Sequence, residues 1–422
     1  MARNRSKPRG ERTVAVLDIG SSKVAALIAL IGPDADVPRV IGVHQLACNG
    51  MKAGLVADLD AVEAAVRQAM GKAEQNAGVT VKGATISVSA GGLESDVGTV
   101  EVEIGGQRIE RADLDHVHAE ARTALDPAGR TVLSAEPALY LLDKENAVKT
   151  PLGLHADQLG VAIHILSADA APLRNLETAV RSADLDVERR VAAPIAAARA
   201  CLSAQERELG VALVDLGAGR TNVAIFTEGL LAGFSSIAMG GEDMTADIAS
   251  AMGTPRAAAE RLKALKGSAS ALPRDNHEMI DVQGLAPGAA GDDLHQRPRA
   301  ELVHAIRTRL DMMFAEVEER FGELGFHGPR ARQVVLTGGG AALAGIADYA
   351  EGALGRHVRV GLPAGLTGLP DGQRSSAFTV LTGLALVAAD GREEFWHQQD
   401  AGFVPPRGGG LTRLWHMLKE NI

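Results

Sequence analysis

Residues 14–30 read VAVLDIGSSKVAALIAL, and the same pattern returns at residues 211–226 as VALVDLGAGRTNVAIF. In each copy an apolar run ends in Asp-x-Gly and is followed by a second apolar run. This pattern predicts a buried strand, a tight turn and a second strand. Glycine in the turn lets backbone N–H groups approach a bound anion, and the aspartate before it suits Mg²⁺ held through water.

A single Asp-x-Gly turn after a strand is common and does not by itself indicate a binding site. The presence of two such copies is what makes a nucleotide site a specific prediction. A further strand runs into a glycine triplet, in VVLTGGG at residues 334–340. Two related halves would then close on a nucleotide, with the hairpins on its phosphates and the triplet beneath its adenosine. The triplet alone is also compatible with a simple helix entry. The chain has no Gly-x-x-x-x-Gly-Lys-Ser/Thr motif, so the site is not a P-loop.

Composition narrows the class of protein. A chain of 422 residues is too long to fold around a single hydrophobic core, so two or more domains are expected. Since only 3% of the residues are aromatic, the cores of these domains must be built mainly from Ala, Val, Leu and Ile. A net charge of -10 argues against nucleic acid as the main ligand. Cys48 and Cys201 lack metal-ligand spacing and are interpreted as reduced thiols of an intracellular protein. No apolar run approaches the roughly 20 residues that span a bilayer.

Patterning along the chain predicts the organisation. Helices are expected over residues 58–77, 111–125, 171–183, 241–252, 255–266 and 299–321. Alternating residues at 83–104 predict strands and a hairpin that open a small α+β block. Residues 267–298, rich in Gly and Pro, are expected to be irregular at least in part. The basic N-terminus is expected to be a disordered, solvated arm, with weak attraction to anionic lipid as the alternative.

The residues at 18–23, 215–222 and 337–340 resemble the phosphate and adenosine motifs of the actin, Hsp70 and sugar-kinase superfamily. Within it the chain resembles the FtsA family of bacterial division proteins over nearly its whole length. The resemblance implies an α/β, actin-like two-lobed fold of duplicated RNase H-like domains, with an inserted small α+β subdomain of SHS2 type and a C-terminal amphipathic helix. The implied parts are a basic tail (1–12), domain 1A (13–82, 168–208 and 376–392), subdomain 1C (83–167), domain 2A (209–242 and 330–375), subdomain 2B (243–329), a flexible linker (393–410) and the helix (411–422).

The resemblance also implies ATP and Mg²⁺ as cofactors, with Mg²⁺ held through water by Asp18 and Asp215. The implied nucleotide-binding residues are Asp18, Gly20, Ser21, Ser22, Lys23, Asp215, Gly217, Ala218, Gly219, Arg220, Thr221, Asn222, Gly240, Gly241, Glu260, Lys263, Gly338, Gly339 and Gly340. Glu260 and Lys263 lie three apart on one predicted helix, so both can face one ligand, although an exposed ion pair would look the same.

Two positions depart from the family pattern. Ala138 stands where many relatives have a polar residue that orients the attacking water, so we expect at most weak ATPase activity, with Glu136 as the alternative base. Asn222 stands where relatives often have aspartate, which weakens any case for this residue as a charged partner of Mg²⁺.

The last twelve residues have helical amphipathicity. An apolar face carries a tryptophan, two basic residues flank it, and a flexible linker precedes it. The face comprises Leu411, Leu414, Trp415, Leu418 and Ile422, flanked by Arg413 and Lys419. The pattern predicts a membrane-targeting helix, and a terminal helix packed on the globular body is the alternative.

The resemblance implies a peripheral protein on the cytoplasmic face of the inner membrane at the division septum. It would form head-to-tail filaments, anchor the FtsZ ring by binding the FtsZ C-terminal tail, and recruit later division proteins. Arg299 and Arg309 are the candidate tail-binding residues, although either is also explained as a solvated helix charge. Two other functions stay open: a sugar-kinase or polyphosphatase-type phosphotransferase, and a PilM-like pilus-assembly scaffold, which should lack the linker and terminal helix.

Overall fold

The computed structural model describes residues 11–32, 37–89, 92–124, 129–285, 294–329 and 331–390. Two five-stranded sheets with the same topology form the centre of the molecule. In each sheet three antiparallel strands are followed by two strands that pair in parallel. The sequence prediction of a duplicated, actin-like α/β fold is therefore confirmed at the level of topology.

The first sheet has the order β11-β6-β1-β2-β3. Its strands are β1 (Arg12–Ile19), β2 (Lys23–Ile31), β3 (Arg39–Ala47), β6 (Gly83–Val88) and β11 (Asp186–Ala192). Its helices are α1 (Leu59–Ala77), α3 (Ala170–Ser182), α4 (Ala193–Cys201) and α10 (Thr379–Ala389). Alternate residues of β1 face opposite cores: Leu17 packs with α1 and α3, and Val16 packs with α4 and α10. Because both faces are covered, the strand sequence is continuously apolar.

The second sheet has the order β14-β13-β12-β17-β18. Its strands are β12 (Val211–Leu216), β13 (Thr221–Thr227), β14 (Leu230–Ile237), β17 (Gln333–Thr337) and β18 (His357–Val360). The helices α5 (Ala204–Leu209), α8 (Arg299–Glu323) and α9 (Ile346–Leu354) belong to this half. Val214 and Ile225 pack in the same core as buried residues of α8 and α9, and Leu213 and Phe226 pack toward α4.

Helices α4 and α10 join the two lobes. One continuous core contains residues of both helices and of both sheets. The helices approach so closely that a Cβ at Gly383 would lie 1.7 Å from the Ala196 carbonyl oxygen. Glycine on α10 and the alanine-rich α4 therefore allow these two helices to pack closely against each other.

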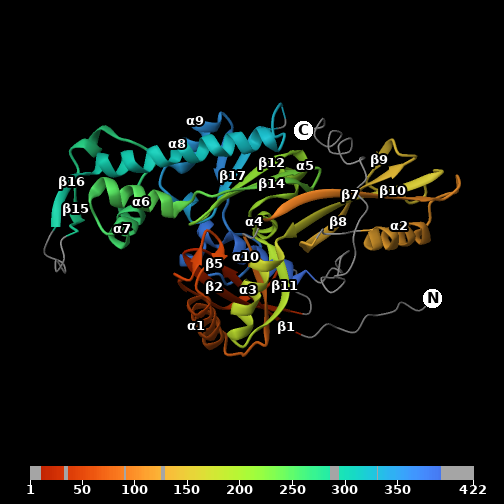
Figure 1. Cartoon of the computed structure of the whole chain (residues 1–422), viewed down its shortest axis with the longest axis horizontal. Helices are drawn as coiled ribbons and strands as arrows, with labels where there is room; N and C mark the ends of the chain where they lie inside the picture. The colour runs from red at the N-terminus through yellow and green to blue at the C-terminus, as the bar shows by residue number, and fades with distance from the viewer. Residues whose placement is uncertain are drawn as a thin grey trace.

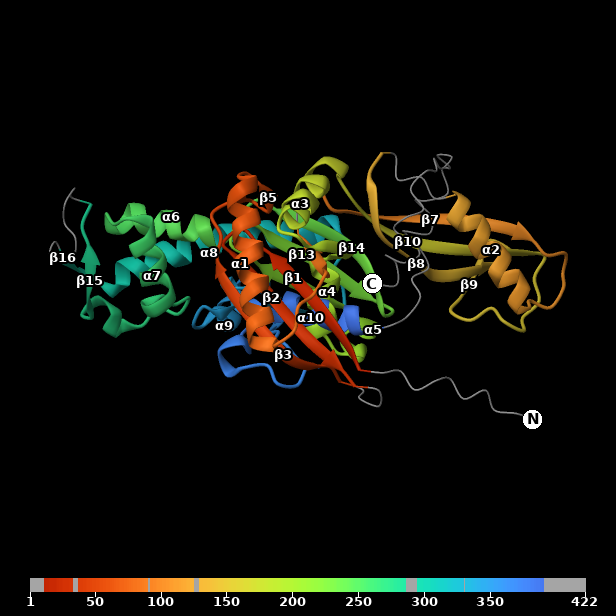
Figure 2. The same ribbon diagram turned by 90° about the horizontal axis from the view of Figure 1, so that it is seen from below.

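Two smaller parts lie at opposite ends of the long axis (Figures 1 and 2). One contains α6 (Gly241–Met252), α7 (Arg256–Lys266), the hairpin β15 (Met279–Gln283) and β16 (Leu294–Pro298), and the first part of α8. The other is a sheet of order β7-β10-β8-β9 with one helix. It comprises β7 (Glu94–Glu103), α2 (Arg111–Ala124), β8 (Thr131–Leu142), β9 (Asn146–Val148) and β10 (Gln158–Ala168). A short hairpin, β4 (Met51–Lys52) and β5 (Leu55–Val56), precedes α1.

One sequence prediction needs correction, and a second is refined. The inserted block was expected to start at residue 83, but β6 pairs in parallel with β1 and β11 and belongs to the first lobe. The block therefore starts after β6, and β6 and β7 are not a hairpin because they lie in different sheets. Residues 267–298 were expected to be irregular only in part, and within them β15 and β16 form an antiparallel pair with five pairs of residues in register. At residues 83–104 the alternation was recognisable, whereas the pairing partner of β6 was not.

The predicted helix of residues 58–77 is confirmed in detail. The Asp58 carboxylate accepts a hydrogen bond from the Ala61 amide at 3.1 Å, which caps the helix N-terminus. Within the described ranges no helix is long and apolar enough to cross a membrane.

Candidate functional site

A cavity of about 520 Å³ lies between the two lobes. Both Asp-Gly hairpins and the glycine triplet line it, together with residues of α6, α7, α4 and α10. Of the predicted nucleotide residues, all but two are on its wall. The two matching hairpins therefore do share one cleft, as the duplication predicted.

The hairpins have the same geometry. The Gly20 amide donates to the Lys23 carbonyl at 2.9 Å, and the Gly217 amide donates to the Arg220 carbonyl at 2.9 Å. In register, Asp18 faces Ala25 and Asp215 faces Asn222. Lys23 of the first lobe and Arg220 of the second thus occupy equivalent positions, Lys23 as the first residue of β2 and Arg220 directly before β13.

The tips of the two hairpins are in contact. A Cβ placed at Gly219 would lie 2.7 Å from the Ser21 hydroxyl oxygen and 3.0 Å from the Ala53 Cα. The Ser21 hydroxyl accepts a hydrogen bond from the Gly54 amide at 2.8 Å, and Arg220 Nε donates to the Ala53 carbonyl at 2.6 Å. The β4–β5 hairpin of the first lobe is therefore held against both phosphate-loop candidates, and only glycine fits at 219.

The two aspartates have perturbed acidities. Burial and the charge of Asp18 raise the pKa of Asp215 to about 6, while the Asn222 amide and Lys23 oppose the shift. Burial also raises the pKa of Asp18, against a 2.8 Å hydrogen bond from Ser87 and the charge of Lys23. Two carboxylates that repel each other in a buried cleft favour binding of a cation between them.

Lys23 supplies one positive charge beside these carboxylates. Burial lowers the pKa of its ammonium group, while Asp18 and Asp215 raise it. Its Nζ donates to the Ala377 carbonyl at 2.9 Å and lies 4.3 Å from the centre of the Phe378 ring. The lysine thus reaches from β2 to the segment that leads into α10.

The carboxylate pair fits Mg²⁺ bound together with a phosphate. Among the residues that the structure describes, no three His, Cys, Asp or Glu side chains are grouped to hold a metal ion. Mg²⁺ typically takes one or two carboxylates and completes its shell with water and phosphate oxygens. Asp18 and Asp215 match that requirement, and they would hold the ion only when a phosphate or water supplies the remaining ligands.

Glu260 and Lys263 of α7 lie on the opposite side of the cavity. Lys263 Nζ lies 2.6 Å from Glu260 Oε2, 2.8 Å from the Gly241 carbonyl and 2.7 Å from the Thr245 hydroxyl. The Lys263 side chain is 16% exposed and that of Glu260 is 56% exposed. The pair is thus an ion pair and also part of the cavity wall, so both predicted roles are compatible.

The glycine triplet needs glycine at its first position. Gly338 has a φ of +84°, and a Cβ there would lie 2.2 Å from Asp215 Oδ1. The Gly338 amide donates to the Ser376 carbonyl at 3.2 Å, and the Ser376 hydroxyl donates to the Gly338 carbonyl at 2.9 Å. The triplet therefore contacts a carboxylate of its own lobe and the segment that leads into α10.

Two predicted residues support the cavity from behind. The Thr221 side chain is buried, and its hydroxyl donates to the Met239 carbonyl at 2.9 Å. A Cβ at Gly240 would lie 2.3 Å from the Ala218 carbonyl oxygen, so Gly240 packs against the back of the second hairpin. Asn222 has a similar supporting role, because its Oδ1 accepts from Ser236 at 2.8 Å while its amide donates to Asp215.

Sequence reasoning missed several residues of the site. Ser87 is buried in β6, donates to Asp18 and accepts from the Ile19 amide at 3.2 Å. The alternation at 83–104 predicted a strand here, but nothing in the pattern distinguished Ser87 as a partner of Asp18. Other lining residues without a sequence signal are Gly54, Ser89, Ala193, Glu242, Met244, Leu265, Ser376 and Thr379.

The prediction that Ala138 stands at the position of a water-orienting residue in the cleft is wrong. Ala138 lies within β8 of the inserted block, and neighbouring residues of that strand pair with β10. Residues 136–139 do not line the cavity, because β8 lies in the separate four-stranded sheet. The lack of a polar side chain at residue 138 therefore gives no reason to expect slow hydrolysis.

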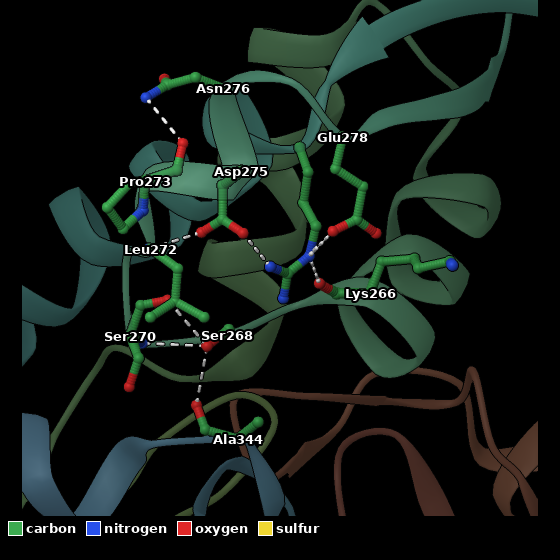
Figure 3. Close-up of polar contacts among 10 residues, drawn as sticks. Lys266, Ser268, Ser270, Leu272, Pro273, Asp275, Asn276, Glu278 and Ala344 are labelled. Atoms are coloured by element: carbon green, nitrogen blue, oxygen red, sulfur yellow. Dashed lines mark hydrogen bonds and ion pairs between the residues drawn. The ribbon is translucent and has the colours of Figure 1, made fainter.

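Both candidate tail-binding arginines have partners inside the protein. Arg309 Nε and one terminal nitrogen bind the Asp247 carboxylate at 2.6 and 2.9 Å, and its side chain is 17% exposed. Arg299, 14% exposed, pairs with Asp275 and donates to the Lys266 carbonyl at 3.1 Å. Figure 3 shows the labelled Asp275, Glu278 and Lys266 around this contact. Neither arginine is the solvated helix charge that formed the alternative explanation.

The predicted membrane residues Leu411, Arg413, Leu414, Trp415, Leu418, Lys419 and Ile422 lie outside the described residues. The same is true of the linker at 393–410 and of residues 1–10 of the basic tail.

Comparison with known proteins points to one family. Residues 212–383 match the model of "Cell division protein FtsA", and residues 91–167 match that of the "SHS2 domain inserted in FTSA". The chain is 36% identical to the cell division protein FtsA of Rhizobium meliloti (strain 1021) over 420 residues, which covers 97% of this chain and 95% of that protein. The second model begins after β6, in agreement with the corrected start of the insert.

Solved structures with low sequence identity share the fold. The PilM-PilN type IV pilus biogenesis complex has a chain that matches with a TM-score of 0.60 at 17% identity, covering 89% of this chain and 98% of that one. MreB5 of Spiroplasma citri bound to ADP matches with a TM-score of 0.50 at 13% identity, covering 89% and 95%. At these identities the likeness shows the actin-like fold alone.

Proposed function

Because this chain belongs to the FtsA family of cell division proteins, we propose that it binds Mg-ATP between its lobes and links the FtsZ ring to the inner membrane. One observation carries the nucleotide part of the proposal: two equivalent Asp-Gly hairpins and a glycine triplet line the same cavity. Hairpin amides suit phosphate oxygens, and the two aspartates suit a hydrated Mg²⁺.

The adenosine would lie on the side of α7 and the glycine triplet. Glu260 and Lys263 present hydrogen-bonding groups there, and Met244, Leu265 and Leu343 add apolar surface. A mixture of apolar wall and a few polar groups is typical of cofactor sites. The second lobe thus would hold the base and ribose, while both lobes grip the phosphates.

The C-terminal residues support the membrane part of the proposal. Burial of the apolar face in a lipid interface stabilises a short helix that is marginal in water. Head-to-tail filaments would multiply this weak attachment through avidity. The filament would be peripheral, on the cytoplasmic face of the inner membrane at the septum, and would recruit later division proteins.

The FtsZ C-terminal tail would dock on the small subdomain that contains α6, α7 and the first part of α8. Arg299 and Arg309 remain the residues proposed for that contact. Since both are paired internally, an acidic tail would have to displace or extend those pairs. Substitution of either arginine would therefore also change the local stability of the fold. Its carboxylate partner, Asp275 or Asp247, must be substituted in parallel as a control.

Liposome co-sedimentation tests the proposed function. The full chain and a variant that ends at Gly410 are mixed with vesicles, with and without Mg-ATP. We expect the full chain to sediment, more so with Mg-ATP, and the truncated chain to stay in solution. Asp18→Asn and Asp215→Asn in the full chain should remove the effect of Mg-ATP but keep the basal binding. Equal sedimentation of the full and truncated chains would refute the helix as anchor.

A further inference from the structure

The loop of residues 267–272 joins α7 to the short 3-10 helix η1 (Pro273–Asn276) and begins at the wall of the nucleotide cavity. Leu265 and Gly267 line the cavity from the side of α7. Leu343 and Ala344 line it from the side of the glycine triplet. The loop therefore starts beside the part of the wall where the adenosine is proposed to lie.

Hydrogen bonds join this loop to the turn at residues 343–345. The Ala269 amide donates to the Ala344 carbonyl at 2.8 Å, and the Ser268 hydroxyl lies 3.4 Å from the same oxygen. The Ser268 hydroxyl also accepts from the Ser270 amide at 3.0 Å, and Figure 3 shows these three residues in sequence between the loop and the turn. The loop therefore ties the end of α7 to the turn that follows the glycine triplet.

Arg299, the first residue of α8, binds the chain on both sides of this loop. Its Nε donates to the carbonyl of Lys266, directly before the loop, at 3.1 Å. A terminal nitrogen donates to one oxygen of the Asp275 carboxylate in η1, and the other oxygen accepts from the Leu272 amide at 2.8 Å. The Asp275 side chain is 2% exposed. One guanidinium group therefore fixes the two ends of the loop relative to each other.

We propose that Arg299 is a positioning residue of the nucleotide cavity, which keeps the end of α7 and the turn at 343–345 at the spacing that accepts an adenosine. This inference rests on the proposed binding of Mg-ATP and gives Arg299 a role that needs no partner protein. Arg299 does not line the cavity itself. It acts through the carbonyl of Lys266, which lies between the lining residues Leu265 and Gly267.

The buried carboxylate explains why the loop depends on this arginine. Without the guanidinium group, Asp275 would be a buried charge that has lost its cationic partner, which is strongly unfavourable. The carboxylate regains water when the loop opens, and opening breaks the bond from Ala269 to Ala344. Loss of either charge of the pair should therefore loosen the same wall of the cavity.

Nucleotide binding by the full chain tests the proposal. Arg299→Gln and Asp275→Asn remove the same contact from opposite sides. Arg297→Gln is the matched control, because Arg297 lies two residues earlier and pairs with Glu301 instead. Calorimetric titration with ATP, with and without Mg²⁺, measures affinity. Hydrogen exchange of the nucleotide-free protein measures the opening of residues 267–272, with β1 as the internal reference.

We expect Arg299→Gln and Asp275→Asn each to bind Mg-ATP about tenfold more weakly, because each loses a hydrogen bond between charged groups. The ratio of affinities with and without Mg²⁺ should stay native, since the phosphate side of the cavity is unchanged. Amides at 267–272 should exchange faster in both variants, while β1 and the Arg297→Gln control remain native.

The two opposite charge changes separate this role from a direct electrostatic one. If Arg299 acted only by attracting the negative nucleotide, Asp275→Asn would bind Mg-ATP more tightly than the native chain. That result, native affinity in both variants, an equal loss in the control, or equally faster exchange in β1 would overturn the inference. Absence of Mg-ATP binding in the native chain would instead refute the nucleotide part of the proposed function, and this inference with it.

Discussion

Arg220 of the second lobe donates its Nε hydrogen to the carbonyl oxygen of Ala53 in the first lobe, at 2.6 Å. Ala53 has a φ of +48°, a conformation that directs the tip of the β4–β5 hairpin across the cleft. Because this bond connects the lobes beside the cavity, it couples the position of the hairpin to lobe closure.

Arg220→Lys keeps the positive charge but removes the Nε donor. A hydrogen bond from a charged group contributes about 1.5–3 kcal/mol, so the hairpin at 51–56 should exchange its amide hydrogens roughly tenfold faster or more. Hydrogen exchange followed by mass spectrometry measures this in the nucleotide-free protein. Exchange in β15 and β16 serves as the internal reference, and unchanged protection at 51–56 would contradict the coupling.

Asp215→Asn should stabilise the nucleotide-free protein at neutral pH. The folded-state pKa of about 6 lies above the ordinary value, so the folded protein binds more protons than the unfolded chain between about pH 4 and 6. Stability therefore falls as pH rises through that window, by up to about 3 kcal/mol. Asparagine avoids this penalty, and thermal unfolding at pH 7.5 should show a Tm several degrees higher, with a smaller gain at pH 5.

The same variant should bind Mg-ATP more weakly, because one of two carboxylates proposed to hold the ion is lost. Calorimetric titration with and without Mg²⁺ measures this. If the Asp215→Asn protein were less stable at pH 7.5 than the native chain, the buried charge of Asp215 would not lower the free energy of unfolding, and the prediction would be wrong.

Adjacent glycines of the triplet should respond differently to alanine. At Gly338 the positive φ and a Cβ contact of 2.2 Å to Asp215 predict a loss of about 2–4 kcal/mol in the free energy of unfolding. At Gly339 the φ is -64° and an added Cβ meets nothing within 4 Å, so Gly339→Ala should keep native stability. Denaturant unfolding of both variants measures the contrast.

Gly339→Ala then serves as a probe of the cavity. If the triplet lies beneath the adenosine, the extra methyl group should reduce ATP affinity in a protein that is otherwise fully folded. Native ATP affinity of this variant would place the adenosine elsewhere.

The Arg309–Asp247 pair distinguishes a contact role from a structural role. Arg309→Gln and Asp247→Asn remove the same bidentate pair from opposite sides, and each should lower stability by about 1 kcal/mol. If Arg309 contacts the acidic FtsZ tail, Asp247→Asn should raise tail affinity while Arg309→Gln lowers it. Fluorescence anisotropy with a tail peptide measures both, and a parallel loss in the two variants would assign Arg309 to folding alone.

The sequence by itself determined the features that depend on local chemistry. Asp-x-Gly between two apolar runs dictates a buried hairpin, and its repetition at Asp18 and Asp215 predicted the duplicated fold and most of the cavity wall. The Asp58 cap and the helix after it followed from side-chain chemistry within one turn.

Tertiary structure decided what depends on pairing between distant segments. Alternation marked β6 as a strand, but only its register with β1 and β11 placed it in the first lobe and put Ser87 against Asp18. The bond from Arg220 to Ala53 and the pairing of Arg309 with Asp247 arise in the same way. Periodicity reports which face of an element is apolar, whereas the identity of the neighbour on that face is fixed only when the whole chain packs.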